Sequence, residues 1–479
     1  MRHRLFNWLG WSGLDAIGRL ALLTGSTAIF SRYLTPHDFG VAALILTVVT
    51  LASVFVGAPF EEALAQRKVL RLVHLRASLA ACWLGCLGWL IFSIPLGLLL
   101  AKAYHEPQIA LLMPLCMASI FFSGHSDVLT GLVRRQRRFS DLAMATLFGN
   151  FVGIALSVVV GLLGYGVWAL AAQRALVVIV RAIALQWRMD IILTPAWSTA
   201  HLRDIRRYAG LALIDRLADT LTFLAFNYLV GAFYSINTLG YVNMAMRLVE
   251  PIRGAIGATG HNLAFSFFAR LQHDPERLRD RAHAVISKAS LAIAPVFIGL
   301  AAVTPVLLPL VSGPGWDESI EIAICLAIGS AIAIPARLIC TALSAKGRPE
   351  YSLIANIGGF LATLTVLALG RHLGPVSVGL GRIAGDLLQA TIAIGVSPSL
   401  LNWSRAGRFF ALAPAWIFAG LMGLFVAGFH HAAPRFGQLL ELALSVSLGL
   451  AIYGLFLLVF ARSHFDGLTH LLARRKAEA

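Results

Sequence analysis

Fourteen charged side chains within otherwise apolar stretches of this sequence are the candidates for chemistry. Eight are cationic, and all of them are arginines: Arg19, Arg174, Arg181, Arg216, Arg247, Arg253, Arg337 and Arg382. Six are acidic: Asp15, Asp127, Asp215, Asp219, Glu250 and Asp386. A charge at the centre of a bilayer costs about 2.5–3.5 kcal/mol on insertion scales. We therefore expect these side chains to face a protein interior or a water-filled cavity.

Several of the charges fall on one helix face. Asp15 and Arg19 are one turn apart within 10–33, so they could form a structural ion pair. Arg382 and Asp386 have the same spacing, and Arg181 and Arg337 could also have structural partners. The surplus of arginines over acids favours an anionic ligand, because the planar guanidinium group matches phosphate geometry. The eight arginines are the candidate substrate-binding residues, and the six acids are candidates for ion pairing or for ion or proton coupling.

Composition indicates an all-α polytopic membrane protein. The 479 residues are 58% hydrophobic and 13% charged, whereas about a quarter of the residues in a soluble domain are charged. The net charge is +16, but the basic residues are spread over short loops and are not gathered in one domain. This distribution excludes nucleic acid as a partner.

We predict about fourteen membrane-spanning helices. They are 10–31, 39–60, 77–101, 107–129, 141–163, 165–187, 208–232, 238–261, 287–311, 319–343, 351–370, 375–396, 409–429 and 438–460. With the N-terminus inside, the inside segments carry 27 basic residues and the outside loops carry four. This bias predicts that both termini are cytoplasmic. In the long inside loop 264–288, Asp274 before Pro275 predicts the start of a separate short helix along the membrane surface.

The first half of the chain recurs in the second half after 200 residues. Glycines 10 and 40 align with glycines 210 and 240, Asp15 with Asp215, and Gly57–Ala58 with Gly257–Ala258. Such a repeat predicts two six-helix lobes in the same orientation, at 1–200 and 201–404. The nearly uncharged spans in 405–479 would be two additional C-terminal helices followed by a cytoplasmic tail.

No residue pattern indicates covalent chemistry, a metal or a cofactor. The five cysteines lie in apolar spans, and the histidines lack metal-ligand spacing with acidic partners. No nucleotide-binding, nucleophile-elbow or zinc-protease motif occurs. We expect a protein that is not an enzyme and not an ATP-driven pump.

Several segments, in order along the chain, resemble those of bacterial polysaccharide exporters and Wzx-like oligosaccharide flippases of the multidrug/oligosaccharidyl-lipid/polysaccharide superfamily. These segments are SRYLTPHDFGVAALILTV (31–48), ALAQRKVLRLVHLRAS (63–78), VRRQRRFSDLA (133–143), LLGYGVWALAAQRA (162–175), ARLQHDPERLR (269–279), LLPLVSGPGWDESI (307–320) and ALSAKGRPEYSLIANI (342–357). The resemblance covers about residues 5–400, and the first and fourth segments are the most specific.

This resemblance implies two lobes around a central cavity that opens to each side of the bacterial cytoplasmic membrane in turn. The expected substrate is an oligosaccharide repeat unit on undecaprenyl diphosphate, used for exopolysaccharide or lipopolysaccharide synthesis. Polysaccharide polymerase and glycosyltransferases are further expected partners, besides membrane lipids. In related lipid II flippases the last two spans form a groove for the lipid tail, which fits the nearly uncharged 409–460 region here.

Two other functions remain open at this point. A membrane glycosyltransferase or ligase acting on lipid-linked sugars would need acidic residues on a sizeable outer loop, and the outer loops are short. A drug or cation antiporter of the same superfamily should favour carboxylates over arginines in its cavity. The arginine surplus favours the flippase.

Overall fold

The protein is almost entirely helical. The computed structural model describes residues 2–67, 69–136, 138–189, 192–269, 271, 274–346, 348, 350–401, 405–432 and 437–460. In these residues there are sixteen α-helices, one 3-10 turn (Arg371–Leu373) and no strand, which confirms the all-α class. The chain divides into two compact units, Met1–Arg247 and Leu248–Ala479.

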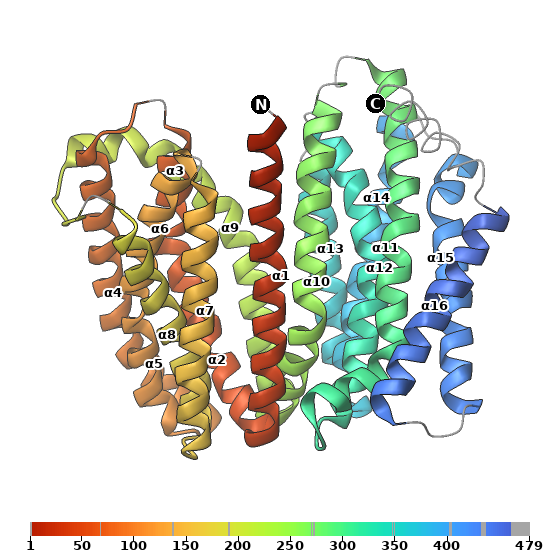
Figure 1. The fold of residues 1–479 in the computed structure, drawn as a ribbon, viewed down its shortest axis with the longest axis horizontal. Helices are drawn as coiled ribbons and strands as arrows, with labels where there is room; N and C mark the ends of the chain where they lie inside the picture. Colours follow the sequence, from red (N-terminus) through yellow and green to blue (C-terminus); the bar gives the residue numbers. More distant parts are fainter. Residues whose placement is uncertain are drawn as a thin grey trace. The chain divides into compact units, whose positions relative to one another are not determined.

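The helices follow the predicted spans closely. The first unit contains α1 (Arg2–Tyr33), α2 (Pro36–Val56), α3 (Ala58–Gln66), α4 (Leu72–Tyr104), α5 (Gln108–Ala118), α6 (Ile120–Arg135), α7 (Phe139–Leu162), α8 (Val167–Trp187), α9 (Thr199–Phe233) and the start of α10 (Ile236–Ala269) (Figure 1). The second contains the rest of α10, α11 (Pro275–Ser312), α12 (Asp317–Ala345), α13 (Glu350–Leu369), α14 (Val376–Leu401), α15 (Arg405–Ala432) and α16 (Gln438–Phe460).

Ten described segments are long and apolar enough to cross a membrane. Two of these each join two consecutive helices, α2 with α3 and α5 with α6. The remaining helices, α1, α9, α10 and α14, are 26 to 35 residues long, and about 20 residues suffice to cross the hydrocarbon core. The structure thus has a helical segment at every predicted span, while the count of fourteen crossings stays a prediction.

Local sequence sets where two of the helices begin. At α2, the Thr35 hydroxyl accepts a hydrogen bond from the Asp38 amide, and the Asp38 carboxylate accepts one from the Thr35 amide. This capping box, with Pro36 in the first turn, satisfies amides that have no partner within the helix. At α11, Asp274 accepts a hydrogen bond from the Arg277 amide at 3.1 Å. The helix then continues without a break to Ser312, so the prediction of a separate surface helix is wrong.

The connections of the first unit meet at two opposite ends of its helices. At one end, His37 Nε2 lies 2.8 Å from Glu106 Oε1, which joins the loop before α2 to the loop after α4. At the other end, Arg134 forms an ion pair with Glu61 at 2.8 Å, and Arg138 donates to the carbonyl of Arg188 at 3.0 Å. This is the arrangement expected for helices that alternate in direction. Which end is cytoplasmic stays a prediction from the distribution of charge.

Reporter fusions test that orientation. A reporter fused after Lys102 or after Gly313 should read outside the cytoplasm, and a reporter fused after Arg138 should read inside, because basic loops are retained in the cytoplasm. A phosphatase and a fluorescent protein, used at each position, give complementary signals. An outside signal after Arg138 would contradict the proposed orientation.

The start of α2 and the start of α10 approach each other through two glycines. A methyl group on Gly40 would overlap the carbonyl oxygen of Ile236, and one on Gly240 would overlap that of Pro36. Since 36 and 40 differ from 236 and 240 by 200, the two contacts are reciprocal. A twofold relation between repeated segments produces such a pair, and both contacts lie at the same end of their helices. The duplication prediction gains support from this geometry.

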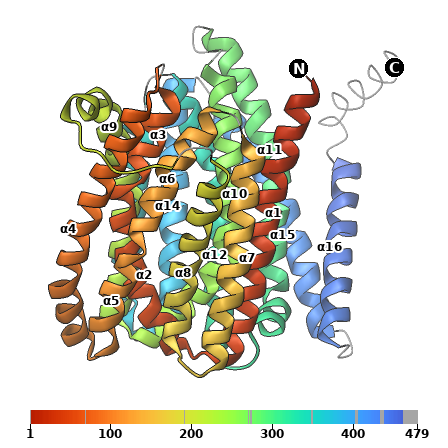
Figure 2. The same cartoon turned by 60° about the vertical axis from the view of Figure 1, so that its left-hand side comes forward.

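The second unit is built around α11, α12 and α14. Packing of α12 and α13 against α14, and of α11 against α12 and α15, buries a cluster that includes Phe268, Ile286 and Leu343. The final two helices, α15 and α16, lie side by side in both views (Figures 1 and 2). Both contact α11, and the aromatic rings of Phe418 and Phe456 stack between them.

The division into compact units differs from the predicted lobes. The boundary at Arg247 falls within α10 because α9 packs on α2, α3 and α4 of the first unit. The predicted boundaries at 200/201 and 404/405 rest on the repeat and on span number. That three-part division stays a prediction.

Candidate functional site

Charged side chains within the second unit form a connected cluster. Arg253 on α10 donates from Nη2 to Asp386 Oδ1 at 2.9 Å and from Nη1 to Asp386 Oδ2 at 3.3 Å. Glu250, one turn earlier on α10, is 3.9 Å from Arg253 and 3.6 Å from Nη2 of Arg382 on α14. Arg253 and Asp386 are only 5% and 6% exposed. The cluster therefore joins α10 to α14 through buried charges.

Arg337 extends this cluster from α12. Its Nε donates to Gln389 Oε1 at 3.2 Å, and the amide of Gln389 in turn contacts Asn356. The three arginines 253, 337 and 382 face two carboxylates, Glu250 and Asp386. One positive charge thus remains in the cluster for an anionic ligand.

A smaller cluster lies within the first unit, on α6 and α8. Arg181 donates to the hydroxyl of Thr130 at 3.1 Å. Arg174, two turns earlier on α8, lies near enough to Asp127 and Arg181 for electrostatic interaction. Among the described residues, Arg174 has no hydrogen bond or ion-pair partner within contact distance. This cluster also carries one more arginine than carboxylates, and Arg174 is its available cation.

Two further predicted arginines have distinct surroundings in the first unit. The Arg247 guanidinium lies 5.0 Å from the centre of the Phe39 ring and donates to Asn243 at 3.2 Å. Arg19 on α1 is exposed. A cation over an aromatic face is stabilised by the ring quadrupole. Arg247 is therefore held in place before any ligand arrives.

The other predicted site residues lie outside the side chains that the structure describes. They are Asp15, Asp215, Arg216 and Asp219. Their roles, and the suggested pairing of Asp15 with Arg19, stay predictions.

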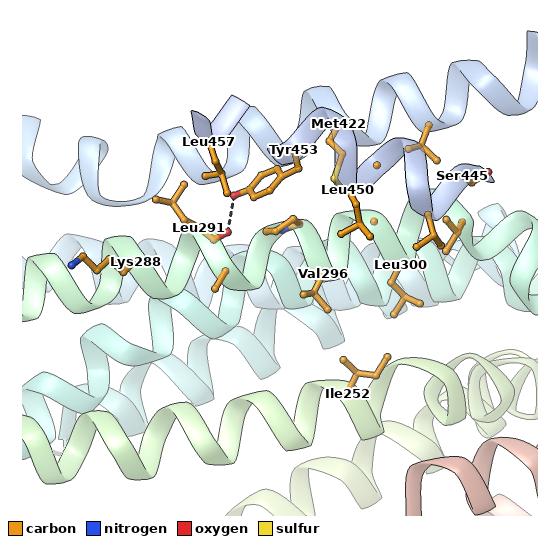
Figure 3. Close-up of a pocket in the computed structure, with 17 residues that line it drawn as sticks. Ile252, Lys288, Leu291, Val296, Leu300, Met422, Ser445, Leu450, Tyr453 and Leu457 are labelled. Carbon is orange, nitrogen blue, oxygen red and sulfur yellow. Dashed lines mark hydrogen bonds between the residues drawn. The ribbon is translucent and has the colours of Figure 1, made fainter. Parts of the chain in front are cut away.

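The structure shows in the second unit an apolar groove that the sequence only partly indicated. Its volume is about 760 Å³, and it lies between α11 on one side and α15 and α16 on the other, with Ile252 of α10 also in its lining. Figure 3 shows Leu291 of α11 beside Tyr453 and Leu457 of α16, and Val296 and Leu300 on the side of α11 toward Ile252. Ile252 immediately precedes Arg253 in sequence. Helix α10 thus contributes neighbouring residues to the groove and to the charged cluster.

Polar groups mark the two ends of the groove. Lys288 lies at one end and Ser445 at the other (Figure 3). Ser445 donates to the Glu441 carbonyl at 2.7 Å, and its Oγ is 3.5 Å from Nε2 of His430. His430 also contacts the Glu441 carboxylate at 2.9 Å. The nearly uncharged 409–460 region indicated one wall of the groove, but the sequence gave no signal that α11 supplies the facing wall.

The described part of the chain contains no group of three or more His, Cys, Asp or Glu side chains that could hold a metal ion. The five cysteines are free and buried.

Comparison with known proteins identifies the family. A family model described as polysaccharide biosynthesis protein matches residues 29–321. The chain is 25% identical to the succinoglycan biosynthesis transport protein ExoT of Rhizobium meliloti (strain 1021), over 98% of this chain and 96% of that protein. It is 20% identical to the lipopolysaccharide biosynthesis protein WzxC of Escherichia coli (strain K12), over 82% of this chain and 80% of that protein.

Solved structures share the fold. The lipid II flippase MurJ in an inward closed conformation superposes with a TM-score of 0.77 at 12% identity, over 96% of this chain and 99% of that one. An inward-facing multidrug resistance transporter of the MATE family and MOP superfamily superposes with a TM-score of 0.61 at 17% identity. The match covers 80% of this chain and 94% of that one. These likenesses confirm the expected transporter fold. Because the family model covers more than half of the sequence, the chain belongs to the polysaccharide biosynthesis protein family, as its motifs predicted.

Proposed function

We propose that this protein is a flippase that moves a polyprenyl-diphosphate-linked oligosaccharide across the bacterial cytoplasmic membrane. It is a membrane transporter and not an enzyme, in keeping with relatives that are named for transport and polysaccharide biosynthesis. The observation that carries the proposal is the apolar groove, which lies in the same unit as a cluster with an excess of arginine. One ligand that needs both environments is an anionic glycolipid.

Each part of the substrate has a matching environment. The polyprenyl tail occupies the groove between α11 and α16, where burial of apolar surface contributes roughly 25 cal/mol per Å². The diphosphate interacts with the charged cluster of the second unit, in which Arg337 and Arg382 belong to an excess of arginines over carboxylates. Guanidinium groups bind phosphate through paired hydrogen bonds. The sugar remains in the aqueous cavity that the family resemblance implies.

Translocation requires no bond to be made or broken. The protein alternates between conformations that expose the cavity to the cytoplasm and to the outside, while the tail stays in the apolar groove. Asp127, Glu250 and Asp386 are candidates for coupling this change to ions or protons, as are the acids predicted on α1 and α9. Glycosyltransferases would act on the cytoplasmic side before this step, and polymerase would act on the outer side after it.

A transport assay separates this function from sugar transfer. Purified protein in proteoliposomes should move a fluorescent lipid-linked oligosaccharide between leaflets, measured by the fraction that an impermeant quencher reaches. The same preparation should transfer no sugar to an acceptor. Sugar transfer without movement of the lipid would favour the membrane glycosyltransferase instead.

A bulky side chain in the groove should slow flipping. Ala292 is exposed and lines the groove, so Ala292→Phe should exclude the tail and reduce the flipping rate by roughly tenfold, which corresponds to about 1.4 kcal/mol. Ala284→Phe is the matched control, because Ala284 is an exposed alanine of the same helix that does not line the groove. Equal rates for the two variants would remove the groove from the mechanism.

A further inference from the structure

Lys288 is the one charged residue among the described residues that line the groove. The other sixteen lining residues are uncharged, and only Ser445 and Tyr453 among them carry a polar side chain. Tyr453 already donates its hydroxyl to the Leu291 carbonyl at 2.6 Å. Lys288 lies at the end of the groove near Leu291 and Leu457, away from Ser445 (Figure 3).

The ammonium group of Lys288 has no protein partner within the described part of the chain. It is exposed, and no carboxylate there lies within 4 Å of it. The charges of Arg277 and Arg279, on the same helix, are paired with Asp274 and Asp280 at 3.1 and 2.8 Å. Lys288 thus differs from these basic neighbours in offering an uncompensated charge beside an apolar surface.

The position of Lys288 along α11 puts it at the depth of a lipid headgroup. From Lys288 to Ser312, where the helix ends, there are 24 residue steps, or about 36 Å at 1.5 Å per residue. The hydrocarbon core is about 30 Å thick. Helix α11 begins in the loop that the charge distribution places inside. With the orientation predicted from the charge distribution, Lys288 marks the cytoplasmic end of the groove.

We propose that Lys288 binds the diphosphate of a polyprenyl carrier as its tail enters the groove from the cytoplasmic leaflet. This inference rests on the proposed flippase function and deepens it. The lysine fixes the headgroup at the entrance while the apolar walls take up the tail, so that the carrier is loaded before its diphosphate reaches the arginine clusters. Three rotatable N–H donors on a flexible stem suit a ligand that binds first and then moves on.

A lysine at this depth could instead merely extend its charge to the interface to avoid hydrocarbon. Such a lysine would contribute nothing to lipid recognition. The two roles differ in their dependence on the lipid headgroup. A phosphate-binding lysine distinguishes a polyprenyl diphosphate from the uncharged polyprenol, whereas an interfacial lysine does not.

Binding to the full-length protein in nanodiscs tests the proposal. The probes are undecaprenyl diphosphate, undecaprenol and phosphatidylglycerol, each quantified by native mass spectrometry. Lys288→Met should weaken binding of undecaprenyl diphosphate by about tenfold, the effect expected for one charge-assisted hydrogen bond. Undecaprenol binding should stay within about twofold, and Lys288→Arg should retain most of the affinity. Arg279→Met, a charge loss on the opposite face of α11, should have no effect.

Other outcomes overturn the proposal. Unchanged binding of the diphosphate to Lys288→Met, an equal loss for undecaprenol, or equal competition by phosphatidylglycerol would each show that Lys288 does not recognise the carrier headgroup. Failure of the unaltered protein to bind undecaprenyl diphosphate is a separate result, and it would reject the proposed function itself.

Discussion

Replacing Arg253 with alanine is expected to lower the free energy of unfolding by about 3–5 kcal/mol. Arg253 donates to both carboxylate oxygens of Asp386, and both side chains are buried. Loss of the guanidinium leaves Asp386 buried with its main counter-charge removed, which costs far more than the lost attraction. The midpoint of thermal unfolding in detergent, followed by size-exclusion chromatography, measures the loss.

Two companion variants separate a structural role from substrate binding. Arg337→Gln should destabilise much less, because Arg337 donates to the neutral amide of Gln389. The double variant Arg253→Met with Asp386→Leu should regain stability, since neither charge is stranded. We expect this double variant to flip the substrate, because the pair neutralises itself. A stable double variant without transport would show instead that Arg253 serves the substrate.

Sequence spacing identified the charged residues but not how they pair. Along one helix, only residues three or four apart are neighbours, which suggested a pairing of Arg382 with Asp386. The structure places the Asp386 carboxylate on Arg253, 133 positions away, and brings Arg382 to Glu250. These contacts depend on how α10 packs against α14. Side-chain periodicity within one span carries no information about that packing.

The positions of the helices could be predicted because hydropathy and turn residues are local properties. Thr35 and Asp38 set the start of α2 within the sequence itself. The exception was Asp274, whose capping role was recognised while the length of the helix after it was not. From the sequence, this segment belonged to the inside loop 264–288. Buried contacts of Leu278 and Ala282 with the second unit's core instead extend α11 beyond the apolar stretch.

Only one wall of the groove could be predicted from the sequence, because the other wall depends on how helices pack. The low charge of 409–460 pointed to a lipid-facing pair of helices. Its opposite wall comes from Leu291, Val296 and Leu300 of α11, which read from sequence as an ordinary membrane span. In the sequence, Lys288 is one of the 27 basic residues assigned to the inside segments. Its placement beside the groove is a property of the fold.

Gly40→Ala and Gly240→Ala are each expected to lower the free energy of unfolding by about 1–3 kcal/mol. The added methyl groups would overlap the backbone carbonyls of Ile236 and Pro36. A backbone atom cannot rotate away as the end of a side chain can, so α2 and α10 must separate. Gly25→Ala and Gly88→Ala are the controls, because a methyl group at either position meets nothing within 4 Å. They should be neutral or stabilising, since alanine favours the helix over glycine by about 1 kcal/mol.

The same separation should expose residues beside the contact. Leu239 is 0% exposed next to Gly240, and the five native cysteines are buried, so a Leu239→Cys variant should react slowly with an impermeant maleimide. Adding Gly40→Ala should raise its labelling rate several-fold, whereas adding Gly88→Ala should not. Because the two glycine contacts are reciprocal, Gly240→Ala is expected to expose Phe39→Cys in the same way. A labelling increase at only one of these positions would mean that the 200-residue repeat does not produce an equivalent contact at both glycines.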